Sequence, residues 1–147
     1  MLMIKFNKLV FIIFVFLNIL NLSFAEDNFF EEGKIKYDEK SYEEAKFLFQ
    51  RGIVFNPKDE KSYLYLAKIF NIEENKKEEK KNIDTVLLLE PKNEEANYML
   101  MEIELKRSNY LKVRELAQSF SKICIELCGK EKIILESLKD LEPKNES

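Results

Sequence analysis

The sequence predicts an all-α domain made of about three helical hairpins, and two observations lead to this prediction. The first is an internal repeat: residues 56–60 (NPKDE) correspond to residues 90–94 (EPKNE), each follows an apolar run, and Pro57 and Pro91 lie 34 residues apart. A period of roughly 20–50 residues is typical of stacked structural units. The second is that helix start and stop signals recur in this register. The expected parts are repeats at about 26–59, 60–93 and 94–128, a capping helix at 131–141 and a tail at 142–147.

The first 25 residues have a different composition from the rest of the chain. Lys5 and Lys8 form a short basic start, an apolar run follows, and Ser23 and Ala25 put small residues at the two positions that a signal peptidase reads. This order of basic, apolar and small residues is typical of a secretory signal peptide. We therefore expect residues 1–25 to be a signal peptide and the product to be exported to the periplasm or cell envelope.

An uncleaved membrane anchor is the alternative for this segment. A helix that spans a bilayer needs about 20 apolar residues, and the run here is shorter and is interrupted by Asn18 and Asn21. A lipoprotein would need a cysteine directly after the run, and the two cysteines of the chain are Cys124 and Cys128. We expect membrane contact only through an uncleaved signal, if at all.

Charge argues against nucleic acid as a partner. The chain carries 24 basic and 27 acidic residues, a net charge of −3. Removal of Lys5 and Lys8 with the signal would make the product more acidic still. Nucleic acids select basic faces that neutralise their phosphates, so a protein partner is the better expectation.

The first repeat supplies the small residues that let two helices approach closely, Gly33 and Ala45. Ser41 and Glu44 have the spacing of a capping box, which predicts a helix start at this point. Pro57 ends that helix, because proline lacks the N–H of a helical residue and clashes with the preceding turn. In the second repeat, Ala67 is the small residue expected where the two helices approach each other.

The residues within these units resemble the tetratricopeptide repeat (TPR). The first block of the family pattern is matched in the second repeat by Tyr63-x2-Leu66-Ala67-x2-Phe70, with Pro91 at the expected end. The first repeat matches the other half of the pattern at Gly33, Tyr42, Glu44, Ala45, Phe49, Gly52 and Pro57. The resemblance implies a TPR-like helical-hairpin solenoid of about three repeats with a C-terminal capping helix. A related helical-hairpin array, such as a Sel1-like one, is the alternative fold.

The second helix of the second repeat, at about 74–89, departs from the family pattern, since Glu79 replaces the usual small residue. In the third repeat, Asn93 precedes two glutamates and predicts a helix over 94–107. A longer helix is expected from Tyr110 to Leu127.

Gly129 is expected to stop that long helix. The capping helix at 131–141 would then place four apolar residues on one face. These residues are Ile133, Ile134, Leu138 and Leu141.

Catalysis is not expected. The chain has no histidine, which removes the commonest general base and the usual Ser-His and Cys-His nucleophiles. Gly33, Gly52 and Gly129 are isolated, so no glycine-rich phosphate loop is present. The abundant carboxylates follow helix-surface spacing. We therefore expect no enzyme activity, no cofactor and no metal site.

Cys124 and Cys128 lie four residues apart, and within a helix they would share one face. An exported protein meets oxidising conditions that favour disulfides. Buried packing thiols, a disulfide that restrains the last helices, and a redox or metal function all remain open.

The resemblance implies that the first helices of the hairpins line a concave groove. Residues at the corresponding positions mix aromatic, aliphatic and charged side chains, which suits an extended peptide or a partner helix. These candidate partner-binding residues are Phe30, Lys34, Tyr37, Leu64, Lys68, Asn71, Tyr98, Glu102 and Leu105. A clamp for a terminal carboxylate is not expected, because Lys34 is the one basic residue among its five positions and Glu95 has the wrong sign.

The function expected from these features is a protein–protein interaction adaptor or scaffold, exported to the bacterial cell envelope. A self-associating structural module, and hence a homo-oligomer, is one alternative. An accessory regulatory subunit of an envelope enzyme is another. Sites rather than folds determine function, so the sequence leaves the partner unidentified.

Overall fold

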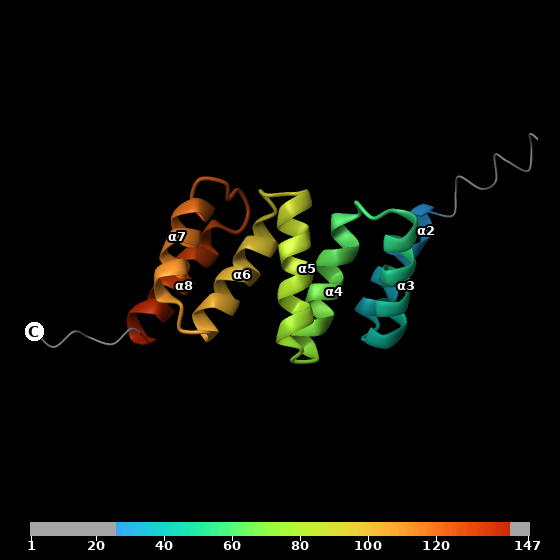
Figure 1. Ribbon diagram of the computed structural model, residues 1–147, viewed down its shortest axis with the longest axis horizontal. Coiled ribbons are helices and arrows are strands. Elements are labelled where there is room, and N and C mark those ends of the chain that lie inside the picture. The colour runs from blue at the N-terminus through green and yellow to red at the C-terminus, as the bar shows by residue number, and fades with distance from the viewer. Residues whose placement is uncertain (1–25, 142–147) are drawn as a thin grey trace, which may run out of the picture. The chain divides into compact units, whose positions relative to one another are not determined.

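The computed structural model describes residues 26–141, and these residues form seven helices and no strand (Figure 1). The predicted all-α architecture of hairpins is therefore confirmed. The predicted signal peptide at 1–25 and the tail at 142–147 lie outside the described residues. In chain order the helices are α2 (Glu26–Asp38), α3 (Tyr42–Phe55), α4 (Glu60–Ile72), α5 (Lys76–Leu89), α6 (Glu94–Lys106), α7 (Tyr110–Phe120) and α8 (Cys128–Leu141).

The helices divide between two compact units, which meet in the chain after Pro57. The first unit contains the α2–α3 hairpin. Gly33 lies against the buried ring of Phe49, and a Cβ atom at Gly33 would come within 2.7 Å of that ring. The predicted close approach at Gly33 is confirmed. Phe30 flanks Phe49, with ring centroids 5.9 Å apart.

The second unit contains α4 to α8 and has two apolar clusters. The first cluster lies among α4, α5 and α6, where Ala67, Ile83, Val86 and Ala96 are fully buried. The small side chain of Ala67 lets α4 approach α5 closely, as the sequence predicts.

Glu79 of α5 is only 1% exposed. Its carboxylate accepts a hydrogen bond from the side-chain amide of Asn71 in α4 and pairs with Lys76, whose Nζ lies 3.2 Å away. A buried charge is costly unless it is paired and hydrogen-bonded. These two contacts explain how the second hairpin accommodates a glutamate where the repeat pattern has a small residue.

The second cluster joins α6, α7 and α8 through Met101, Val113, Phe120, Ile134 and Leu138. The C-terminal helix therefore caps the array, as predicted.

The predicted apolar face of α8 is only half right. Ile134 and Leu138 are buried, but Ile133 and Leu141 are 52% and 55% exposed. Leu135 packs against the cluster in their place. Ile134 and Leu138 lie one helical turn apart, so they share a face that Ile133 flanks rather than occupies.

The long helix predicted from Tyr110 to Leu127 is wrong. α7 ends at Phe120, residues 121–127 form a loop, and α8 begins at Cys128, which places Gly129 in the first turn of α8 instead of after a helix. The backbone N–H groups of residues 125–127 donate to the side chain of Glu94. They are thus unavailable for a helical ladder, and this partner lies about thirty residues away in sequence, where a local pattern does not reveal it.

The predicted helix starts had mixed outcomes. The Asn93 side chain accepts from the Ala96 N–H at 2.9 Å, which confirms the start of α6. Ser41 lies at the N-cap of α3, but its side chain makes no capping hydrogen bond. The capping box predicted with Glu44 is therefore wrong.

The turn inside each hairpin contains one residue with a left-handed backbone. These residues are Lys40 (φ 62°), Glu74 (φ 58°) and Ser108 (φ 57°), and they recur at the 34-residue period. The sequence hides this feature, because glycine, the usual residue for that conformation, is absent at all three positions.

Candidate partner-binding groove

A hollow of about 460 Å³ opens in the second unit, where α4, the start of α6, the 121–127 loop and the first turn of α8 meet. We call it the groove. Its apolar lining comes from Leu64, Tyr98 and Leu127, and its charged lining includes Glu94, Glu95 and Lys130. The groove therefore offers apolar surface with charged groups of both signs around it.

Tyr98 is held in one orientation within the groove. Its hydroxyl donates to the Glu102 carboxylate at 2.8 Å, and the ammonium of Lys130 lies 5.0 Å from the ring centroid. Burial, together with the hydrogen bond and the negative charge of Glu102, raises the pKa of Tyr98 to about 12. The phenol therefore remains a neutral donor at physiological pH, and the cation over its face is a favourable contact.

An ion pair joins α4 to α6 beside the groove. Lys68 Nζ lies 2.9 Å from the Glu95 carboxylate and 4.4 Å from the centroid of the Tyr65 ring. Because Lys68 is half-buried, this pair is screened less than a fully exposed one. It links the two helices that form the groove.

Glu94 lies at the start of α6 and reaches the 121–127 loop. Its carboxylate accepts from the backbone N–H groups of Ile125 at 2.8 Å, Glu126 at 3.1 Å and Leu127 at 2.8 Å. Hydrogen bonds to the charged form favour that form. The bond from Leu127 is the largest cause that holds the pKa of Glu94 below its ordinary value of 4.5; partial desolvation opposes it, and the bonds from Ile125 and Glu126 add to it.

The structure brings four of the nine predicted binding residues to this groove. Leu64 and Tyr98 line it, while Lys68 and Glu102 hold the lining residues Glu95 and Tyr98.

The remaining five predicted residues lie elsewhere. Leu105 packs against the second apolar cluster, and Asn71 binds Glu79. The other three belong to the first unit. There Phe30 flanks Phe49, Lys34 Nζ lies 2.6 Å from Asp38, and Tyr37 makes an edge contact with Tyr42 at 5.6 Å between centroids.

Seven residues that line the groove were not among the predicted binding residues. Four of them lie just before or at the start of α6: Lys92, Asn93, Glu94 and Glu95. The other three are Glu126, Leu127 and Lys130. The sequence pattern placed Glu126 and Leu127 in a long helix and Lys130 at a helix stop. The signal that could have found them is the pair Cys124 and Cys128, which brackets 125–127 and suggests a short closed loop.

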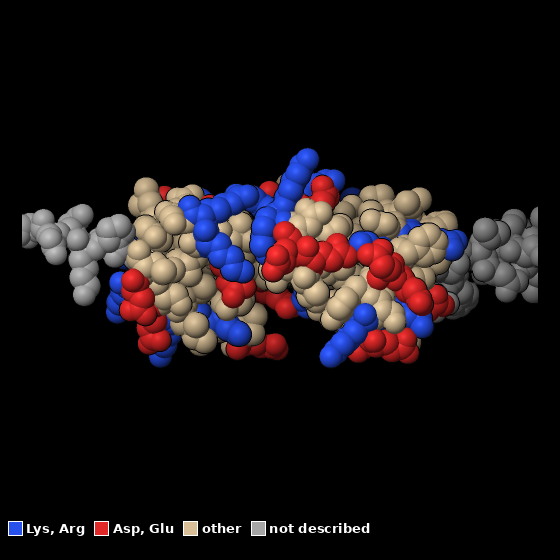
Figure 2. Space-filling model, turned by 90° about the horizontal axis from the view of Figure 1, so that it is seen from below, with Lys and Arg blue, Asp and Glu red and all other residues tan. Residues whose placement is uncertain are grey.

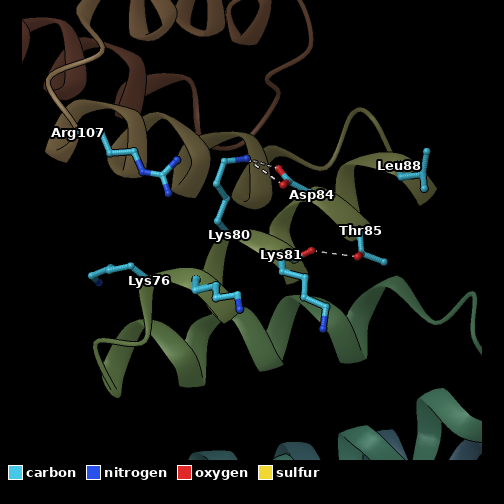
Figure 3. Close-up of a pocket in the computed structure, with 8 residues that line it drawn as sticks. Lys76, Lys80, Lys81, Asp84, Thr85, Leu88 and Arg107 are labelled. Carbon is cyan, nitrogen blue, oxygen red and sulfur yellow. Dashed lines mark hydrogen bonds and ion pairs between the residues drawn. The ribbon is translucent and has the colours of Figure 1, made fainter.

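A second hollow, of about 730 Å³, lies along α5 in the same unit (Figure 3). Its basic lining consists of Lys76, Lys77, Lys80, Lys81 and Arg107. Carboxylates accompany most of these cations. Lys80 lies 2.8 Å from Asp84, Lys76 lies 3.2 Å from Glu79, Lys81 lies 3.4 Å from Glu78, and Arg107 lies 3.5 Å from Glu104.

Five cations and four carboxylates leave this hollow nearly balanced in charge. Ion pairs three or four residues apart along one helix are typical of helix surfaces, and most of these cations already have a carboxylate partner. The hollow along α5 is therefore the weaker candidate. Acidic and basic side chains are interspersed elsewhere on the visible surface as well (Figure 2).

Metal ligation and membrane spanning have no structural basis within residues 26–141. Across this range, no three His, Cys, Asp or Glu side chains are grouped so that they could hold a metal ion. None of the helices within it has the length and apolar character needed to cross a bilayer.

Consecutive antiparallel hairpins with a capping helix are the architecture of a TPR domain. The structure is similar to the Arabidopsis OM64 TPR domain, with a TM-score of 0.69, 16% sequence identity, and coverage of 79% of this chain and 95% of that one. It is also similar to the Sgt2 TPR domain from Aspergillus fumigatus, with a TM-score of 0.64, 16% identity, and coverage of 83% and 87%.

A third similar structure is a chain of the CopN–Scc3 complex, with a TM-score of 0.62, 14% identity, and coverage of 80% of this chain and 69% of that one. At these identities the likeness concerns the fold, and the predicted TPR-like fold is confirmed. No family model and no curated protein matches the sequence.

Proposed function

We propose that this chain is an exported adaptor of the bacterial cell envelope, which holds a peptide or helix of a partner protein in the groove between α4, α6 and α8. The observation that carries the proposal is the make-up of that groove. The groove combines a fixed aromatic ring, Tyr98, with aliphatic side chains and with charged residues of both signs.

This composition suits a protein ligand. Aromatic anchors in a well-packed pocket supply much of the free energy of protein association, and a polar rim excludes water and sets the register. Tyr98 is already held by Glu102 and Lys130 before a partner arrives. Binding would therefore cost little side-chain entropy at this residue.

An adaptor is favoured over an enzyme by the chemistry that is present. The chain has no histidine. The strongly held groups of the groove, Glu94 and Tyr98, make intramolecular hydrogen bonds and are not poised for proton transfer. The similarity to TPR domains supports the same choice.

Export rests on residues 1–25, whose basic, apolar and small residues follow the order of a signal peptide. Mass spectrometry of the protein from the producing cell tests this part. A mature N-terminus at Glu26 is expected, and a chain that keeps its first 25 residues would point to a tethered protein.

The groove is tested by a photo-reactive amino acid placed at Glu126 in intact cells. Glu126 lines the groove, whereas Lys132, exposed on α8, is absent from its lining and serves as the matched control position. Crosslinks to one envelope protein from position 126 but not from position 132 are expected. Equal crosslinking from both positions would contradict the groove, and crosslinks only between copies of this chain would favour the self-associating module.

A charge reversal supplies the second test. Lys130→Glu should weaken capture of the crosslinked protein, because it removes the cation over Tyr98 and adds a negative charge to a groove that already contains several glutamates. Lys132→Glu makes the same change in charge on the same helix outside the groove. Equal capture by the two variants would count against the proposal.

A further inference from the structure

One part of the groove lining is the 121–127 loop, which two interactions hold in place. One is Glu94, which binds the backbone N–H groups of residues 125, 126 and 127. The other is the disulfide between Cys124 and Cys128, whose Cα atoms lie 5.2 Å apart. The three residues between the cysteines are the same three whose N–H groups bind Glu94. The covalent ring thus encloses the whole carboxylate-binding segment.

The ring favours this arrangement through chain entropy. A carboxylate can accept three successive N–H groups only if the backbone curves around it, and an open chain loses conformational freedom when it adopts that curve. Closing residues 124–128 into a ring removes much of this freedom in advance. Reduction would return the freedom and weaken the hold of Glu94 on the loop.

The repeat provides an internal comparison for Glu94. Glu60 begins α4 as Glu94 begins α6, one repeat period earlier. Both carboxylates lie in the first turn of a helix, where the helix dipole favours a negative charge. Only Glu94 faces a disulfide-closed loop, so its role cannot come from its helix position alone.

The loop connects directly to the partner-binding residues. Glu126 and Leu127 line the groove, and Lys130, in the first turn of α8, lies over Tyr98. Movement of residues 125–127 away from Glu94 would therefore shift both the wall and the cation. Cys128 is exposed, so a reductant can reach the disulfide.

We propose that the Cys124–Cys128 disulfide is a redox control of the groove. When the disulfide is intact, Glu94 holds the loop and the groove is formed. When it is reduced, the loop is released and the groove loses the part of its lining that the loop supplies. The reductant is a dithiol. It supplies two electrons and two protons, the S–S bond breaks, two thiols form, and the dithiol becomes a disulfide. The effect on partner binding rests on the function proposed above, whereas release of the loop does not.

Acid supplies an independent way to release the loop. The folded-state pKa of Glu94 is lowered by the loop N–H groups, Leu127 first. Its contribution is therefore complete above its ordinary value of 4.5 and is lost as the pH falls through the lower folded value. Glu94→Gln should imitate this loss at neutral pH, and Glu60→Gln, which changes the equivalent residue of the previous repeat, is the matched control.

The loop is tested by residue-resolved amide hydrogen exchange, measured by NMR on the full chain with and without dithiothreitol. Exchange of the 125–127 amides should become roughly tenfold faster or more after reduction, and the ring signals of Tyr98 should shift as Lys130 moves. Amides of α3 and α5 should not change. Cys124→Ser/Cys128→Ser should behave as the reduced chain without reductant, and Glu94→Gln, but not Glu60→Gln, should also speed exchange. Unchanged exchange of the three amides after reduction would overturn the proposal.

Binding is tested with linear peptides selected from a display library against the oxidised chain. A selected peptide whose affinity falls with Lys130→Glu reports on the groove, and its affinity should drop about fivefold or more on reduction. Equal affinity for both redox forms would overturn the redox control while leaving the adaptor function intact. If no selected peptide responds to Lys130→Glu, the groove function fails, and the exchange measurement still decides whether the disulfide holds the loop.

Discussion

The α2–α3 and α4–α5 hairpins share a register but close their helix crossings in different ways. In the first hairpin, Gly33 leaves room for the Phe49 ring, and Ala45 is fully buried. One period later the same positions are Ala67 and Glu79. The second hairpin thus places a charged side chain where the first places a methyl group, and compensates with hydrogen bonds.

This difference teaches that the repeat specifies a backbone and not a particular core chemistry. Apolar side chains at the crossing require only space, and the first hairpin provides it for the Phe49 ring by omitting a Cβ atom at Gly33. A carboxylate requires partners, which Asn71 and Lys76 supply to Glu79. Both solutions satisfy the rule that buried polar groups are hydrogen-bonded and buried apolar groups are closely packed.

The largest expected effect is on the α2–α3 hairpin, where the side chains at the helix crossing are apolar. Phe49→Ala removes a fully buried ring and should destabilise the α2–α3 unit by about 3–5 kcal/mol, because a cavity remains in addition to the lost transfer free energy. Urea unfolding followed by circular dichroism measures this loss. Phe47→Ala, on an exposed ring of the same helix, is the control and should cost far less. A similar loss for both variants would mean that Phe49 does not organise the crossing.

The α4–α5 hairpin, which buries Glu79 at its helix crossing, should be destabilised when Glu79 loses one hydrogen-bond partner. Asn71→Ala leaves the buried carboxylate of Glu79 without the amide and should cost about 2–3 kcal/mol. With Glu79→Ala added, the Asn71 change should cost markedly less, since no buried carboxylate remains to be satisfied. Additive losses in this double-mutant cycle would show that Asn71 and Glu79 do not interact.

Exchanging the small residues of the two hairpins should destabilise both, for different physical reasons. Gly33→Ala pushes a Cβ atom to 2.7 Å from the Phe49 ring and should destabilise by about 2 kcal/mol through overpacking. Ala67→Gly makes the reverse change at the equivalent position and should also destabilise, by about 1 kcal/mol through helix propensity and about 0.8 kcal/mol more through the loss of a fully buried methyl group. Thermal unfolding of the two variants measures both losses, and a stabilising Gly33→Ala would contradict the close approach.

The smallest effect should be equal in both hairpins, because their turns have the same backbone. Lys40 and Glu74 both have positive φ, and glycine at either position should stabilise by about 0.5–1 kcal/mol, as the relief of left-handed strain exceeds the added chain entropy. Gln50→Gly, inside α3, should instead destabilise by about 1 kcal/mol. Opposite effects at Lys40 and Glu74 would show that the two turns differ.

Much of the fold followed from the sequence because its signals are local or periodic. Pro57 and Pro91 revealed the period, Asn93 predicted the start of α6, and Gly33 predicted a close approach. The turn residues and the end of α7 were not predicted, since positive φ at Lys40 leaves no mark in the sequence and Phe120 is followed by residues that resemble a continuing helix. The groove was predicted only in part, because three of its nine lining residues come from the end of the chain, which lies beyond the repeats that resemble TPR units.

What the sequence by itself determined is the repeat: the hairpin register, the helix boundaries set by proline and asparagine, and the small residues at the crossings. These depend on contacts within about one period of the chain, and each residue type has a direct steric or hydrogen-bonding reason to be there. Only the tertiary structure decided which side chains form the groove. Glu94 holds residues 125–127 from about thirty residues away in the chain. It does so through three backbone N–H groups, which every residue except proline carries, so no sequence pattern distinguishes them.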